Sequence, residues 1–136
     1  MQLLSQKFSD LDLKNDYSIV HKAREGVKSS IFYSFSSSAN ISEKNLAALL
    51  HIHPRTISNY REKKKPLNPV EGEHLLKLIH LFIIGEEVLG SIDQFNQWLS
   101  TPGWQDDEKP IDWLSTPGGV DLVQDELQRL SYGYVV

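Results

Sequence analysis

The chain has 136 residues, 40% of them hydrophobic, which suits one domain or two small ones around a packed core. It has no cysteine, which excludes disulfides and thiolate chemistry and favours a reducing cytoplasm. The N-terminal residues lack the basic start and long apolar run of a signal peptide. The most apolar stretch, residues 75–84, is about half as long as a membrane-spanning helix. We therefore expect a cytoplasmic protein with no membrane segment.

The net charge of −4 is distributed unevenly along the chain. Residues 1–85 hold 12 Lys and Arg against 8 Asp and Glu, whereas residues 86–136 hold 2 against 10. A basic first part suits contact with DNA phosphates. The acidic second part does not, so it either binds a different partner or only keeps a helical surface soluble.

Apolar residues recur at helical spacing throughout the chain, and no segment alternates as strands do, so we expect an all-α fold. Residues 1–15 are mixed and polar, and we expect a frayed or loosely docked arm. Helices are expected over residues 16–25 and 28–35, the first ended by Gly26. Residues 36–40 are expected to form a turn.

Residues 42–65 predict two short helices joined by a tight turn. Leu46 and Leu50 share the apolar face of the first helix, and Ile57 and Tyr60 face inward from the second. This is the arrangement of a DNA-binding helix-turn-helix. An ordinary αα-hairpin would share the apolar spacing, but not the polar and basic residues on the outward face of the second helix.

Those outward residues are of the types that bind DNA. We expect Arg55 and Asn59 to read bases, and the basic run that follows to bind phosphates. His51 stands where such turns usually have glycine, so it must tolerate or avoid a left-handed backbone. His53 stands where Ser or Thr usually caps the second helix, and we expect it to cap the helix or contact phosphate. The candidate DNA-binding residues are His53, Arg55, Thr56, Ser58, Asn59, Arg61, Lys63, Lys64 and Lys65.

A long helix is predicted over residues 69–89, with Asn68 and Glu71 forming a capping box at its start. Its middle is apolar on nearly all sides, whereas a surface helix shows one stripe. We expect it to be buried on both flanks, either as a spine between two halves of the chain or across a homodimer. A helix-turn-helix also gains from two copies on two half-sites.

The C-terminal part contains an internal repeat. The run WLSTPG at residues 98–103 recurs at residues 113–118, and each copy predicts a helix end followed by a Thr-Pro turn. Two copies do not make a solenoid. A helix is expected before the first copy, and a last helix over residues 117–132 has an apolar stripe at Val120, Val123, Leu127 and Leu130.

These segments resemble a known family, the Xre/MbcA/ParS-type antitoxins, which are partners of RES-domain toxins in type II toxin–antitoxin systems. The resemblance lies in LAALLHIHPRTISNYREKKKPLNPVEGEHLLKL, IDQFNQWLSTPGW and KPIDWLSTPGGVDLVQDELQRLSYGYVV, and covers about residues 16–136. It implies a bacterial protein with three parts: a helix-turn-helix DNA-binding domain (1–66), a connecting helix (67–89) and a small helical toxin-binding domain (90–136). It also implies that the protein binds its own operator DNA and blocks a toxin that degrades NAD.

The resemblance places the C-terminal end at the entrance of the toxin's active site. There it would act as a steric plug, and Arg129 would pair with a toxin carboxylate or take the place of a charged substrate group. Alternatively, the tail folds back onto this protein's own core. The implied toxin-binding residues are Arg129, Leu130, Tyr132, Gly133, Tyr134, Val135 and Val136.

Residues for catalysis or metal binding are not grouped in the sequence. His51 and His53 have no cysteine or carboxylate at ligand spacing, and there is no Gly-rich phosphate loop or Ser-His-Asp set. We therefore expect no enzyme activity, no cofactor and no metal. The alternative to an antitoxin is a dimeric helix-turn-helix transcriptional regulator without a toxin partner, whose acidic half only dimerises.

Overall fold

The computed structural model describes residues 3–103 and 107–133 of the chain. Every regular element within these residues is a helix, which confirms the all-α fold with a long helix between the N-terminal and C-terminal parts. The elements are α1 (Leu4–Lys7), α2 (Asp16–Glu25), α3 (Ser29–Ser38), α4 (Glu43–Leu49), α5 (Pro54–Glu62), α6 (Pro69–Leu89), α7 (Ile92–Leu99), the 3-10 helix η2 (Pro110–Trp113) and α8 (Pro117–Ser131).

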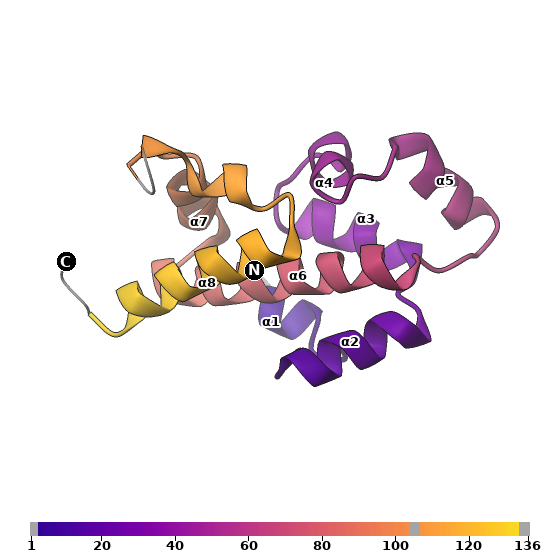
Figure 1. Ribbon diagram of the computed structural model, residues 1–136, viewed down its shortest axis with the longest axis horizontal. Helices are drawn as coiled ribbons and strands as arrows, with labels where there is room; N and C mark the ends of the chain where they lie inside the picture. Colours follow the sequence, from indigo (N-terminus) through magenta and orange to yellow (C-terminus); the bar gives the residue numbers. More distant parts are fainter. Residues whose placement is uncertain (1–2, 104–106, 134–136) are drawn as a thin grey trace.

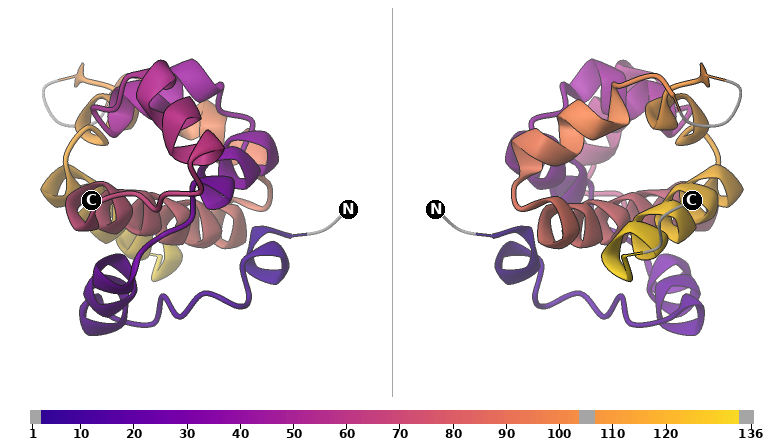
Figure 2. Two further views of the ribbon diagram at one scale, coloured as in Figure 1. Left: turned by 90° about the vertical axis from the view of Figure 1, so that its right-hand side faces the viewer. Right: turned by 90° about the vertical axis from the view of Figure 1, so that its left-hand side faces the viewer.

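The fold is arranged around α6, which runs along the length of the molecule (Figure 1). It contacts α1, α2, α7 and α8, and Figure 2 shows α1 and α2 on one side of it and α4 and α5 on the opposite side. Asn68 and Glu71 cap its start as expected, with hydrogen bonds of 2.8 and 3.1 Å. Gly90, at φ 99°, ends it in the left-handed conformation.

The apolar middle of α6 is covered within a single chain. Leu75, Leu76, Leu78, Ile79 and Leu81 are each 0% exposed without any second copy. The helix is therefore a spine between the two parts of the chain, which was one of the two expected arrangements. Because the spine is already buried, it gives no reason to expect a dimer.

The N-terminal arm is docked over the residues that the structure describes, so of the two expected arrangements of residues 1–15, frayed or loosely docked, the frayed one is wrong there. Leu4, Phe8 and Leu13 are buried in the core. The Leu4 amide donates to the Glu86 Oε1 atom of α6 at 2.9 Å. The arm docks because its few apolar side chains, although widely spaced in a polar segment, reach the face of α6 that would otherwise be open.

Helix α3 continues to Ser38, so the predicted turn over residues 36–40 begins about three residues too early. The Ser36 side chain is buried and donates its hydroxyl hydrogen to the Ile41 carbonyl oxygen. Serines favour turns because they compete for backbone hydrogen bonds, but here one of them makes such a bond from within a helix.

Phenylalanine rings connect the two halves through α6. The Phe35 and Phe95 rings, from α3 and α7, meet the Phe82 ring edge to face, with centroids 5.2 and 4.8 Å away. Gly85 permits this, because a Cβ atom at that position would lie 2.3 Å from the Phe95 ring.

The two copies of WLSTPG have different structural roles. In the first copy α7 ends, and the Thr101 hydroxyl donates to the Gln97 carbonyl oxygen at 2.7 Å. In the second copy the Thr116 hydroxyl accepts the Gly119 amide hydrogen at 3.0 Å and caps the start of α8. The equivalent threonines of the two copies thus lie at the end of one helix and at the start of another, depending on the sequence that follows.

Helices α3, α4 and α5 end in the same type of turn, each with a residue other than glycine in the left-handed region. These residues are Asn40 (φ 55°), His51 (φ 57°) and Lys64 (φ 53°). In each turn the next amide donates to a carbonyl five residues back, as in a Schellman motif, with distances of 3.1, 3.0 and 2.8 Å. Glycine is the usual residue there because a side chain is strained in this conformation.

Candidate nucleic-acid interface

Helices α4 and α5 form the predicted pair. Leu46, Ala47 and Leu50 from the first helix, Ile52 from the turn and Ile57 from the second are all buried. Tyr60 is half-buried on the same face, and its burial, with the nearby Glu71 carboxylate as a smaller cause, raises the pKa of the Tyr60 hydroxyl. The apolar contact fixes the second helix against the first, so the opposite face of α5 is left for a partner.

His51 and His53 each have a defined structural role. His51 tolerates the left-handed conformation at φ 57°, and its Nε2–H donates to the Ser115 carbonyl oxygen at 2.8 Å. His53 caps α5, because its Nδ1 atom accepts the Arg55 amide hydrogen at 3.1 Å. The capping role expected for His53 is therefore confirmed. Neither departure from the usual helix-turn-helix sequence disturbs the α4–α5 geometry.

The outward face of α5 carries the groups expected to read bases. Arg55, Ser58 and Asn59 are exposed, and Thr56 is half-buried. Arg55 and Asn59 are four residues apart, so both side chains leave the same side of the helix. The structure brings these two residues together on one open face.

Two of the basic residues that follow are positioned by aromatic rings. The Arg61 Cζ atom lies 4.6 Å from the centroid of the Tyr33 ring, and the Lys65 Nζ atom lies 5.6 Å from that of the Tyr60 ring. A cation above a ring is attracted by the negative charge of the ring face. Both residues remain exposed, so their charges are held in place at the surface near the end of α5.

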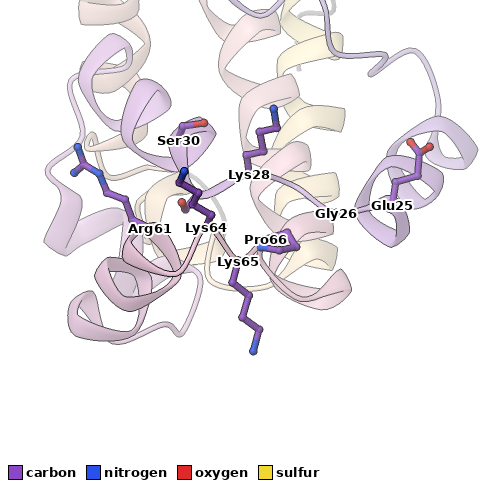
Figure 3. A pocket seen from close by; sticks show the side chains of 9 residues that line it. Glu25, Gly26, Lys28, Ser30, Arg61, Lys64, Lys65 and Pro66 are labelled. Carbon is purple, nitrogen blue, oxygen red and sulfur yellow. The ribbon is translucent and has the colours of Figure 1, made fainter.

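A cavity of about 530 Å³ opens beside this basic segment (Figure 3). Arg61, Lys64 and Lys65 line it together with Lys28, which precedes α3. Lys28 could not be identified as a site residue from the sequence, since nothing local to residues 26–30 distinguishes it from other surface lysines. Its place next to Lys64 comes only from the packing of α3 against α5.

The C-terminal candidates lie at the far end of α8. Arg129, Leu130, Tyr132 and Gly133 are exposed, while Tyr134, Val135 and Val136 fall outside the described residues. The Arg129 guanidinium lies 3.3 Å from the Glu126 Oε2 atom. Leu130 is 43% exposed, whereas Val120, Val123 and Leu127 are fully buried. The predicted apolar stripe therefore ends at Leu127, and Leu130 belongs to the surface.

The remaining histidines lie along α6. His74 is 4% exposed, and its Nε2–H donates to the Leu114 carbonyl oxygen at 2.9 Å. Burial lowers the pKa values of both His74 and His80. In residues 3–103 and 107–133, no three His, Asp or Glu side chains are grouped so that they could hold a metal ion. No helix in these ranges is long and apolar enough to span a membrane.

Comparison with known families identifies this arrangement. Residues 18–80 match the family model of the antitoxin Xre-like helix-turn-helix domain. This part of the chain is similar to the helix-turn-helix domain of Xre-like antitoxins. The matched segment extends from α2 into α6 and includes both α4 and α5.

The fold of this chain is also found among solved structures. A chain in the crystal structure of the M. tuberculosis MbcT–MbcA toxin–antitoxin complex has the same fold, with a TM-score of 0.60 and 16% sequence identity. The similarity covers 79% of this chain and 96% of that one. No curated protein is significantly similar in sequence. The match extends the fold similarity well beyond residues 18–80.

Proposed function

We propose that this protein is an Xre-like antitoxin with two activities, operator binding by the α4–α5 pair and neutralisation of a toxin by its C-terminal part. We assign DNA binding to residues 1–66 and toxin binding to residues 90–136, with α6 joining the two. The observation that carries the proposal is α5 itself. It is fixed on one face by Ile57, capped by His53, and exposes Arg55 and Asn59 on the other.

On DNA, α5 would lie in the major groove. Arg55 is suited to two hydrogen bonds with guanine and Asn59 to two with adenine, each worth about 1–3 kcal/mol of discrimination. His53, Thr56 and Ser58 lie near enough on the same helix to join the contact. Arg61 and the three lysines at residues 63–65 would bind phosphates and so set affinity without sequence preference.

Operator binding is tested on the DNA upstream of the protein's own coding sequence by fluorescence anisotropy. Arg55→Ala and Asn59→Ala should each bind this duplex more weakly while their binding to an unrelated duplex changes little, because base contacts carry specificity. Lys63→Ala is the matched control, and should weaken both duplexes equally. If Arg55→Ala and Asn59→Ala bind both duplexes like the parent, α5 has only a structural role.

We also propose that two copies bind two half-sites. Dimers of this motif place their second helices one turn of DNA apart, about 34 Å. Because α6 is already covered within one chain, the dimer would have to use another surface. Light scattering at micromolar concentration should give twice the chain mass of 15.5 kDa. A monomer, both alone and on the operator duplex, would contradict the homodimer.

For the toxin-binding part, support comes from charge, exposure and fold similarity. Residues 86–136 are strongly acidic, so they do not favour DNA. Exposed Leu130 borders a surface pocket of about 220 Å³ with Trp98, Pro102 and Pro110. The chain of similar fold comes from a toxin–antitoxin complex. We propose that the partner is a RES-domain toxin that degrades NAD, as the sequence resemblance implies.

The proposed mechanism of neutralisation is steric. The end of α8 and the tail would block the entrance to the toxin's active site, with Arg129 exchanging its Glu126 partner for a toxin carboxylate. The antitoxin itself would do no chemistry. Separating Arg129 from Glu126 requires little free energy, since such surface pairs contribute at most about 1 kcal/mol.

The protein encoded by the neighbouring gene should copurify with the antitoxin in a fixed ratio. Removing residues 132–136 should leave the circular-dichroism spectrum and operator binding unchanged but restore toxicity in a growth assay. A truncated chain that still neutralises the toxin fully would place the contact elsewhere in residues 90–131. Absence of any stoichiometric complex would favour a regulator without a toxin partner.

A further inference from the structure

The cavity beside the basic segment forms where a backbone hydrogen bond joins two distant parts of the chain. The Leu67 amide donates to the Val27 carbonyl oxygen at 2.9 Å, and both side chains are buried. Gly26 permits the close approach, because a Cβ atom there would lie 3.2 Å from Pro66. The pairing of Val27 with Leu67 brings the residues that precede α3 against those that follow α5, so the start of α3 forms one wall of the cavity.

The start of α3 has hydrogen-bond donors without acceptors. Lys28 occupies the capping position but makes no side-chain cap. The Ser29 and Ser30 amides have no acceptor among the residues that the structure describes. Ser29 is only 8% exposed, lines the cavity, and its hydroxyl has no hydrogen-bond partner within the same residues. The first amides of a helix that lacks a side-chain cap are open to a ligand with acceptor oxygens.

The opposite wall carries a lysine in a strained backbone conformation. Of the three left-handed residues that end α3, α4 and α5, two use their side chains for tertiary contacts. The Asn40 Nδ2 atom donates to Asp93 at 3.2 Å, and His51 donates to Ser115. Lys64 makes no ion pair or hydrogen bond through its side chain in the described part of the chain. A strained backbone conformation is often found where the side chain of the residue has a functional role. Figure 3 shows the Lys64 side chain extending toward Ser30.

We propose that this cavity binds a phosphate group of the DNA backbone, held by the Ser29 and Ser30 amides and by Lys28, Lys64 and Arg61. The start of a helix attracts anions through its free amides and its dipole. Among the residues that the structure describes, no aromatic side chain lines the cavity, so none of them would stack a base or another ring there. An acidic residue, Glu25, also lines it, and its Oε2 atom is 3.8 Å from the His21 Nε2 atom.

DNA is the favoured source of this phosphate because the cavity adjoins the proposed reading helix. Lys64 and Arg61 belong to the basic segment that ends α5. A duplex read by Arg55 and Asn59 would therefore run its backbone past the cavity. This inference rests on the proposed DNA binding, which it extends by a phosphate contact from α3, outside the helix pair itself.

The first test uses Lys28→Gln, with Lys7→Gln, at an exposed position of α1, as the matched control. Binding of the upstream duplex is measured at several salt concentrations. The slope of log affinity against log salt is negative, and Lys28→Gln should reduce its magnitude by about one, since each phosphate contact contributes about 0.9. Lys7→Gln should leave the slope unchanged. In NMR spectra, the Ser29 and Ser30 amide signals should shift when the duplex is added to the parent protein.

A second variant separates loss of contact from loss of folding. Lys64→Gly removes the charge and relieves the left-handed backbone, so it should raise the melting temperature while also lowering the salt slope by about one. If Lys64 has only a structural role, Lys64→Gly will raise the melting temperature without lowering the salt slope, and that result would overturn the role of Lys64 in the site.

The remaining outcomes decide between the two proposals and between the sources of phosphate. If the duplex binds but Lys28→Gln keeps the parent slope and the Ser29 and Ser30 signals do not move, the phosphate site is wrong and operator binding stands. If no duplex binds, operator binding fails and the phosphate site fails with it. If inorganic pyrophosphate shifts these amide signals and the duplex does not, the cavity serves a small anion instead of DNA, which also overturns the proposal.

Discussion

The Nε2 atom of His51 lies 2.8 Å from the carbonyl oxygen of Ser115, so the turn of the helix-turn-helix is hydrogen-bonded to the segment that begins α8. A carbonyl oxygen only accepts, so Nε2 must carry the hydrogen. His74 bonds the adjacent carbonyl, that of Leu114, in the same way. Two histidines, from the turn and from α6, therefore hold consecutive carbonyls between η2 and α8.

His51 combines a favourable contact with an unfavourable backbone, and two substitutions separate these effects. His51→Ala keeps the left-handed strain and loses the hydrogen bond, so it should lower the free energy of unfolding by about 1 kcal/mol. His51→Gly loses the same bond but relieves strain of about 1 kcal/mol, so it should be nearly neutral. Urea denaturation measures both. Equal stability of the Ala and Gly variants would show that residue 51 is not left-handed in solution.

His74 should make the stability of the protein depend on pH. Burial lowers its pKa below 6.5, its value in an exposed histidine, so the unfolded chain binds a proton at a pH where the folded chain does not. The free energy of unfolding should therefore fall as the pH falls below about 6.5. His74→Gln, which still offers a hydrogen to Leu114, should reduce this dependence. Burial also lowers the pKa of His80, so some dependence should remain. An unchanged profile in His74→Gln would contradict this assignment.

Glu86 should hold the N-terminal arm in place, because its carboxylate accepts the Leu4 amide hydrogen in a buried position. Glu86→Ala leaves that amide without an acceptor and should lower the free energy of unfolding by about 1–3 kcal/mol. Limited proteolysis should then cut within residues 9–15 faster than in the parent. Glu86→Gln keeps an acceptor oxygen and serves as the control. Similar cleavage rates in all three proteins would mean that apolar contacts alone dock the arm.

Gly85 should be needed for the contact between α6 and α7. A Cβ atom there would lie 2.3 Å from the Phe95 ring, so Gly85→Ala should lower the free energy of unfolding by about 1–3 kcal/mol through overpacking. Gly118→Ala is the matched control, since a Cβ atom at that position in α8 meets no atom of the described residues within 4 Å. It should be neutral or slightly stabilising, as alanine favours helices by about 1 kcal/mol. Thermal unfolding compares the two. Equal melting temperatures would mean that the Phe95 ring shifts freely.

The positions of the helices and the helix-turn-helix could be predicted from the sequence because their signals are local. Asn68 and Glu71 are three residues apart, and so are Ser42 and the amide that it caps. The apolar spacing of α4 and α5 repeats within one or two turns. Exposure of Arg55 and Asn59 follows from the burial of Ile57 on the opposite side of the same helix.

Only the tertiary structure decided how these helices meet. The Leu4 amide and Glu86 are 82 residues apart, and His51 and Ser115 are 64 apart. Lys28 and Lys64 line one cavity because α3 packs against α5 and Val27 pairs with Leu67. Helix periodicity says which face of a helix is buried but not which neighbour buries it. That choice depends on the packing of side chains from distant segments, which is why the arm, the histidine contacts and the basic cavity could not be found from the sequence.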